Sequence, residues 1–272
     1  MDMRAKIRLV LPLLFLLSAT ALVLAVTQPE GPSTLTVVNS TRRQAGSALT
    51  TQATAGNITH LIVQGQTVTQ SWQGFVGNIT GTITLDDANN NTLYDWSLAD
   101  PEGEIYATYL SQVNWTAGSV LCWNWTIATA SYLQLAELET NPAAGDGAPS
   151  VYGGIGAAID DVDGVNETFS APGAGAHSNF FAGPQAITVN ATDSACPVTR
   201  LYNNVGGGAF QEVLLYTDGT GANNDGVIYT SILNQSATGY DSHKWDFEMI
   251  VGEDGHNGNV AVTTYYFYVE LQ

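Results

Sequence analysis

The residues best suited to chemistry lie in the acidic stretch 159–167, which reads Ile-Asp-Asp-Val-Asp-Gly-Val-Asn-Glu. Asp161 and Asp163 are two positions apart, so a looped backbone can turn both carboxylates toward one centre, and Gly164 permits the sharp bend. Because hard cations prefer oxygen ligands, the spacing predicts a calcium site. Its ligands would be Asp160, Asp161, Asp163 and Glu167. The stretch lacks the twelve-residue spacing of an EF-hand, so a solvated acidic loop is the alternative.

A second group of oxygen ligands, Asp86, Asp87 and Asn89, precedes a sequon at Asn90. Asp and Asn tolerate left-handed backbone conformations and bond to nearby backbone groups, which is typical of hairpin turns. We therefore interpret this group as a turn between two strands and not as a metal site.

No motif in the chain predicts catalysis. The four histidines lack the HExxH pairing of zinc proteases, and no G-x-S-x-G elbow, P-loop or dinucleotide fingerprint is present. Glycoside cleavage by a pair of carboxylates stays an alternative, because the distance between such carboxylates is set by the fold and does not show in a sequence. The sequence assigns no catalytic residue and favours a protein that is not an enzyme.

The two cysteines, Cys122 and Cys196, predict one disulfide in an oxidising compartment. The bond would close a loop of about 75 residues and stabilise the protein by about 3 to 4 kcal/mol in the chain-entropy model. Two buried thiols are the alternative. The absence of CxxC spacing argues against a zinc site held by cysteines and against a c-type haem.

Nine Asn-X-Ser/Thr triplets, none with Pro in the middle, predict an exported and glycosylated chain, since chance at this composition gives about three. Their asparagines are Asn39, Asn57, Asn78, Asn90, Asn114, Asn124, Asn166, Asn190 and Asn234.

Residues 1–26 have the composition of an export segment. Three basic residues precede an apolar run from Leu9 to Val26, and Ala25 ends a small-residue cleavage motif. Cleavage would release the chain, whereas an uncleaved span of about 18 residues would anchor it with the remainder outside. Both outcomes predict an extracellular or cell-surface location, and contact with the membrane only through this segment.

The net charge is -18, from 7 Lys+Arg and 25 Asp+Glu. Such a surface repels nucleic acid and anionic lipid headgroups and attracts divalent cations. Nucleic acid is therefore excluded as a partner, and envelope components, other copies of the chain or glycans are favoured.

Residues 27–55 are rich in Thr, Ser, Gln, Ala and Gly, which predicts a stalk or linker, and residues 56–272 are expected to form a single β domain. Apolar residues alternate with polar ones at 78–86 and 244–251, a period of two that indicates strands. The run Val260–Leu271 is apolar on both faces, so that strand should be central or covered by a neighbour. Further expected strands include Leu61–Val63 and Val68–Trp72. Short strands between Asp/Asn/Gly turns predict an all-β fold, an antiparallel β-sandwich or jelly roll, after an N-terminal signal or anchor helix.

The chain resembles a recurring β domain of archaeal secreted and cell-envelope proteins. The likeness covers most of the chain after the stalk and lies in the segments Ala55–Thr59, Trp72–Gly74, Gly77–Gly81, Ile83–Asp87, Asn91–Trp96, Phe247–Val251 and Tyr265–Glu270. We know of no established activity for that family, so the resemblance implies an archaeal cell-surface setting and assigns no functional residues.

Two functions follow from these observations. The favoured one is a glycosylated structural or adhesive protein of the cell surface, an envelope or appendage component stabilised by a disulfide and by calcium. The alternative is an extracellular carbohydrate-binding module or glycoside-active enzyme. An exposed strip of Trp and Tyr would favour the alternative, because aromatic rings stack on sugars, whereas most tryptophans of a β-sandwich belong to its core.

Overall fold

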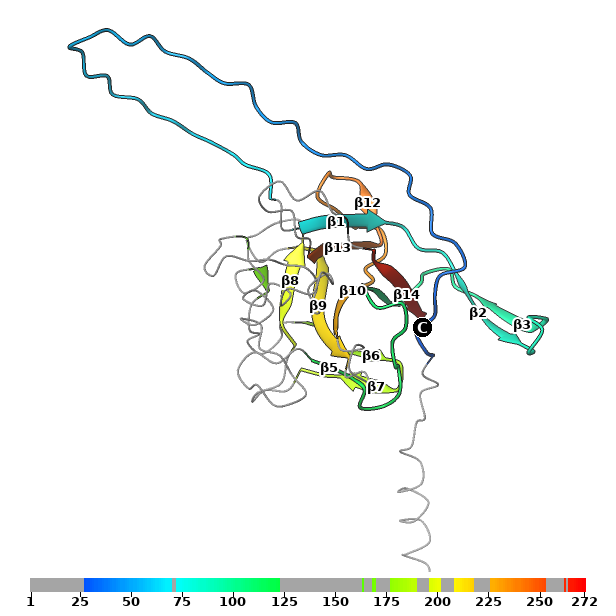
Figure 1. Ribbon diagram of the computed structural model, residues 1–272. Coiled ribbons are helices and arrows are strands. Elements are labelled where there is room, and N and C mark those ends of the chain that lie inside the picture. The colour runs from blue at the N-terminus through cyan, green and yellow to red at the C-terminus, as the bar shows by residue number, and fades with distance from the viewer. Residues whose placement is uncertain are drawn as a thin grey trace, which may run out of the picture.

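A computed structural model of the chain describes residues 27–69, 72–122, 163, 168–169, 177–189, 196–201, 208–217, 226–252, 262 and 264–272. Every element in this part of the chain is a β-strand, and all the strand pairs are antiparallel. The all-β prediction is confirmed (Figure 1). The expected export segment, 1–26, lies outside the described residues, among which no helix is long and apolar enough to cross a membrane.

The centre of the molecule is a six-stranded sheet in the order β14–β4–β10–β9, with β5 and β8 both paired to β9. Since β10 occupies one side of β9, β5 and β8 share the other side, one after the other along the strand. The strands are β4 (Gly103–Thr108), β5 (Val120–Cys122), β8 (Val198–Leu201), β9 (Phe210–Thr217), β10 (Gly226–Ile232) and β14 (Tyr266–Leu271).

Both faces of this sheet are apolar, because its strands read as nearly continuous hydrophobic runs that must be covered on two sides. One face packs against a two-stranded sheet made of β1 (Trp72–Gly77) and β13 (Phe247–Gly252), and Leu214, Tyr229 and Met249 belong to the core between them. The other face, which includes Tyr106 and Leu215, is covered by Trp115 and by the hairpin of β6 (Phe180–Ala182) and β7 (Gln185–Ile187).

The disulfide between Cys122 and Cys196 is present, as the cysteine count predicts. It joins the last residue of β5 to Cys196, two residues before β8, so it connects the two short strands that share one side of β9. His177 Nε2 accepts a hydrogen bond of 3.2 Å from the Cys196 backbone N–H. Burial lowers the pKa of His177, which suits the neutral ring that accepts this bond.

Two smaller hairpins extend the molecule. The first, β2 (Thr82–Asp86) with β3 (Thr92–Ser97), projects from the body, as Figure 1 shows. The second, β11 (Ala237–Thr238) with β12 (Lys244–Trp245), lies beside β13 in the chain.

Residues 31–69 form an extended segment without strands that leaves the body and returns to it (Figure 1); we call it the arm. Just before the arm, Glu30 forms an antiparallel bridge with Val269 on the outer edge of β14, through hydrogen bonds of 3.0 and 2.8 Å. The bridge register would bring Pro32 opposite Phe267. Proline has no N–H to donate there, so pairing with β14 cannot continue and the chain departs.

One expectation about strands is wrong, and of the two alternatives for the C-terminal strand the second is correct. Leu61–Val63 forms no strand because it lies in the exposed arm, where no neighbouring strand pairs with it, and the first strand begins only at Trp72. The C-terminal strand is not central, since β14 is the end strand of its sheet. It is covered by neighbours instead: Glu30 at its edge and Phe75 of β1, whose ring meets Phe267 at 5.2 Å.

Candidate functional site

Of the four predicted calcium ligands, only Asp163 falls within the described residues; Asp160, Asp161 and Glu167 lie outside them. Asp163 joins the end of the arm to the start of β1. Its carboxylate accepts a hydrogen bond from the Thr69 hydroxyl, and its backbone carbonyl accepts one of 2.6 Å from Trp72 Nε1. Within the described ranges, no three His, Cys, Asp or Glu side chains come together as a metal site.

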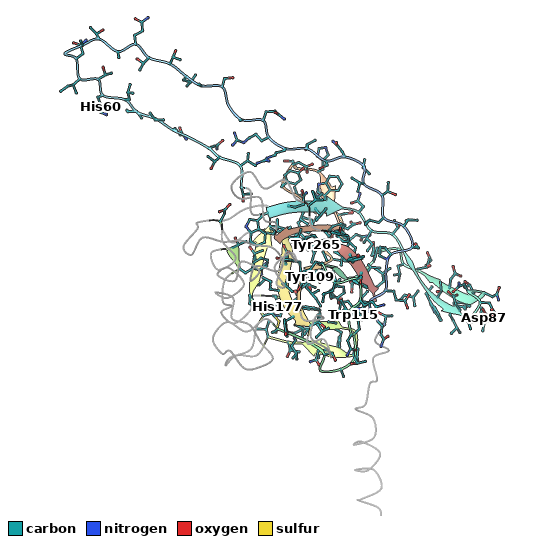
Figure 2. All side chains as sticks on the ribbon, viewed as in Figure 1. His60, Asp87, Tyr109, Trp115, His177 and Tyr265 are labelled. Atoms are coloured by element: carbon teal, nitrogen blue, oxygen red, sulfur yellow. A yellow bond between two sulfur atoms is a disulfide. The ribbon has the colours of Figure 1, made fainter. Side chains whose placement is uncertain are left out.

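The group Asp86, Asp87 and Asn89 forms a turn, as its residue types indicate. Asp87 Oδ1 accepts hydrogen bonds from the backbone N–H groups of Asn89 (2.8 Å) and Asn91 (2.9 Å), and Asn90 has a positive φ of 62°. These bonds, above all those from Asn91, lower the pKa of Asp87 because they favour the ionised form. Its carboxylate is thus used to close the hairpin, whose tip is labelled in Figure 2.

Sequence patterns missed a pair of buried carboxylates on neighbouring strands. Glu104 of β4 lies directly opposite Glu270 of β14, and the two residues are only 3% and 1% exposed. Glu270 Oε2 accepts a hydrogen bond of 2.9 Å from Gly183 N–H and lies 3.1 Å from the Tyr106 hydroxyl. The Thr27 hydroxyl, just before the arm, donates a hydrogen bond of 3.0 Å to the backbone carbonyl of Leu271, the residue after Glu270.

The pair holds one proton at neutral pH. Burial, and next the charge of Glu270, raise the pKa of Glu104 to about 9. Burial raises the pKa of Glu270 to about 6, against the opposing hydrogen bonds from Gly183 and Tyr106. The higher pKa belongs to Glu104, whose one described partner is a distant Gln272 amide at 3.4 Å. Because both carboxylates are buried, we interpret the pair as a pH-sensitive part of the core.

Three more buried carboxylates accept backbone hydrogen bonds between elements. Asp246 receives the N–H groups of Ile79 and Ser236, both at 2.9 Å, and Glu248 receives that of Tyr240 at 2.8 Å. Glu212, fully buried beneath β13, receives that of Ile250 at 2.8 Å. Burial raises the pKa of both Glu212 and Glu248. Of the polar residues that alternate along 244–251, Asp246 and Glu248 are therefore buried beneath hairpin β11–β12, whereas Lys244 is exposed.

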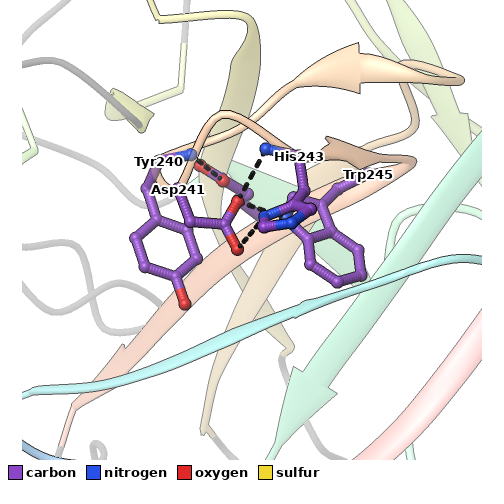
Figure 3. A network of polar contacts seen from close by, with 5 residues as sticks. Tyr240, Asp241, His243 and Trp245 are labelled. Carbon is purple, nitrogen blue, oxygen red and sulfur yellow. Dashed lines mark hydrogen bonds and ion pairs between the residues drawn. The ribbon is translucent and has the colours of Figure 1, made fainter.

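The loop of that hairpin holds the polar network of Figure 3. Asp241 pairs with His243 Nδ1 at 3.0 Å and accepts a hydrogen bond of 2.9 Å from Trp245 Nε1. Burial raises the pKa of Asp241, but the hydrogen bonds from Trp245 and His243 outweigh it and lower the pKa overall. The His–Asp contact is exposed and holds the turn; the described residues place no nucleophile against the ring.

The strongest candidate for a functional surface is the arm. Eight of its nine large aliphatic residues are at least 55% exposed, all except the half-buried Val68: Leu35, Val37, Val38, Leu49, Ile58, Leu61, Ile62 and Val63. Burial of each of these side chains in an interface would contribute about 1.5 to 3 kcal/mol of stabilisation. A single chain with an exposed arm therefore lacks a stabilisation on the order of 10 kcal/mol that a binding partner could provide. Figure 2 shows His60 on the arm, far from the body. An apolar surface of this extent is typical of a site that contacts another molecule.

The projecting hairpin carries a second exposed apolar surface. Tyr94 and Trp96, on one face of β3, are 58% and 48% exposed, and their ring centroids are 4.9 Å apart. Leu85 lies opposite Tyr94 on β2 and is exposed as well. Trp115, by contrast, is buried in the body and contacts Tyr106. Trp123 and Trp125 lie outside the described residues.

The sequon asparagines differ in exposure. Those at Asn39, Asn57, Asn78, Asn90 and Asn234 are exposed. Asn114 is half-buried, with its Nδ2 donating to Ser119 Oγ at 3.0 Å. Asn124, Asn166 and Asn190 lie outside the described residues. Exposed positions are those that an oligosaccharide can occupy without disturbing the fold.

The comparisons with known proteins add no relative: no family model, no curated protein and no solved structure matches this chain.

Proposed function

We propose that this chain is a secreted or membrane-tethered glycoprotein of the cell surface with a structural or adhesive role, an envelope or appendage component. The observation that carries the proposal is the arm, which holds eight exposed aliphatic residues away from a body that is compactly folded without them. A segment of this kind suits a protein that binds other copies or envelope components. The resemblance to archaeal envelope domains supports the same setting.

The remaining parts of the proposal rest on the sequence. The segment 1–26 would export the chain or anchor it, and the exposed sequons would carry glycans. The sheets described here would form a sandwich or jelly roll. Calcium would bind Asp160, Asp161, Asp163 and Glu167, close to the point where the arm meets β1. Melting the protein with and without calcium tests this last point, and identical curves would exclude a stabilising site.

Antibody labelling of intact native cells, together with the mass of the mature protein, tests the proposed function. We expect labelling of unpermeabilised cells or of the medium, and a mass above that of the polypeptide which falls after removal of N-linked glycans. A protein found only inside the cell, with unmodified asparagines, would refute the proposal.

A carbohydrate-binding role is the second candidate, and the exposed Tyr94–Trp96 pair favours it. Stacking of a sugar on an aromatic ring contributes through apolar contact, and two adjacent rings suit a glycan chain. If this role is correct, Trp96→Ala should abolish binding on a glycan array, while Trp245→Ala, at a half-buried tryptophan elsewhere, should not. Absence of binding by the unmodified protein would remove this candidate.

A further inference from the structure

We propose that the arm of one copy adds a strand to the free edge of β1 in a second copy, with residues 34–38 as the donated strand. The inference rests on the proposed structural role and names the partner and the contact through which that role is carried out.

The donated segment has the pattern of a strand that lacks a partner. Thr34 and Thr36 alternate with Leu35 and Val37, so an extended backbone places both aliphatic side chains on one face. Both are exposed in the single chain. Pro32 stops the preceding residues from continuing along β14 of the same chain, which keeps the segment free for another edge.

The receiving edge belongs to the smaller of the two packed sheets. In the described part of the chain β1 pairs only with β13. A sheet of two strands therefore covers one face of the six-stranded central sheet, which is much wider. Phe75 of β1 and Phe267 of β14 meet at this open side and are only partly buried. A strand added to β1 would pair with its free backbone groups, and one apolar face of that strand would cover these rings.

The middle of β1 leaves room for another backbone. Gly74 is exposed, and a Cβ at this position would meet no atom within 4 Å. A glycine within a strand weakens it unless a bulge, a bend or a closely approaching chain requires the residue. The regular register of β1 with β13 shows no bulge at Gly74, which favours the approach of a second chain.

Charge favours another copy as the donor. The arm carries Arg42 and Arg43 and no acidic residue, whereas residues 70–272 carry 23 Asp and Glu against Arg200 and Lys244, a net -21. Acidic bodies repel one another, so the arm is the part of this chain that another body attracts. At about 3.3 Å per residue, half of the arm reaches about 60 Å, more than the width of a 200-residue body.

Donation of this kind joins unlike surfaces, the arm of one copy and β1 of the next. Such heterologous contacts continue from copy to copy and build an open filament unless the rotation between copies closes a ring. The disulfide and the apolar cores on both faces of the central sheet would then keep each body rigid, while the arms connect one body to the next.

Cross-linking between two populations of full-length chain tests the inference. One population carries Val37→Cys and the other Gly74→Cys; both retain the native disulfide. On mixing and mild oxidation, we expect a covalent dimer to form at least about ten times faster than with Val37→Cys and Ala186→Cys. Ala186 is the matched control because it is exposed on β7, on the other side of the central sheet. Equal rates for the two mixtures would overturn the inference, as would a bond that forms only within a chain carrying both Val37→Cys and Gly74→Cys.

Charge substitutions on the arm provide a second measurement. Leu35→Asp/Val37→Asp should abolish assembly seen by light scattering, whereas Ala48→Asp/Leu49→Asp, with the same charge change on the same arm, should retain most of it. Both variants should melt like the unmodified protein, because all four side chains are exposed. Equal assembly of the two variants would overturn the contact. A surface glycoprotein that fails these tests loses only this inference, whereas an intracellular protein loses the proposed function whatever its arm binds.

Discussion

Replacement of both Cys122 and Cys196 by Ser should lower the free energy of unfolding by about 4 kcal/mol, equivalent to a fall in Tm of about 10 °C. The bond closes a loop with a sequence separation of 74 residues, and its loss lets the unfolded chain explore many more conformations. The native state should loosen as well, because β5 and β8 have only three and four residues and share one side of β9.

Thermal melting of the double variant beside the unmodified protein measures this effect. The unmodified protein in reductant is the matched control and should reproduce the variant. Hydrogen exchange should show faster exchange at β5 and β8 than at β10, which lies in the interior of the sheet. Equal melting temperatures with and without the bond would contradict the prediction.

Substitution of Glu104 by Gln should stabilise the protein by about 3 kcal/mol at pH 7 and have little effect at pH 4. Burial, with the charge of Glu270, raises the pKa of Glu104 from 4.5 to about 9. Between these values the folded state retains a proton that the unfolded state releases, so the free energy of unfolding falls as pH rises from about 4.5 to about 9. Gln keeps the shape of the side chain and removes the proton equilibrium.

Melting curves from pH 4 to pH 9 test this prediction, with Glu102→Gln as the matched control. Glu102 is exposed and two residues away, so its substitution should leave the pH profile of the protein unchanged. Glu270, whose pKa is raised to about 6, should keep a weaker decline in stability between about pH 4.5 and pH 6 in the Glu104→Gln variant. A stability gain at pH 4 equal to that at pH 7 would show that ionisation is not the cause.

Both predictions concern the stability of the folded body. The disulfide limits the loosening of two short strands, and the raised pKa values of Glu104 and Glu270 lower the stability of the body as pH rises. The net charge of -18 weakens in acid too, which reduces both the repulsion between bodies and the attraction between a body and the basic arm of another copy.

The sequence alone determined the local features of this protein. A period of two along 78–86 and 244–251 indicated strands, because successive side chains of a strand point to opposite faces. Two cysteines left one possible pairing within the chain, and Asp87 followed by asparagines predicted a turn. Each of these depends on neighbouring residues or on a count, both of which a sequence displays directly.

Only the tertiary structure decided which distant residues meet. Glu104 and Glu270 oppose each other because β4 pairs with β14 in one register, and a shift by one residue would have turned one of them to the other face. On the other edge of β14, the Glu30–Val269 bridge brings Pro32 to the place where a backbone donor is needed, and so the arm leaves the body there. Register is a property of two segments far apart in the chain, and it results from packing of the whole core, which no local pattern contains.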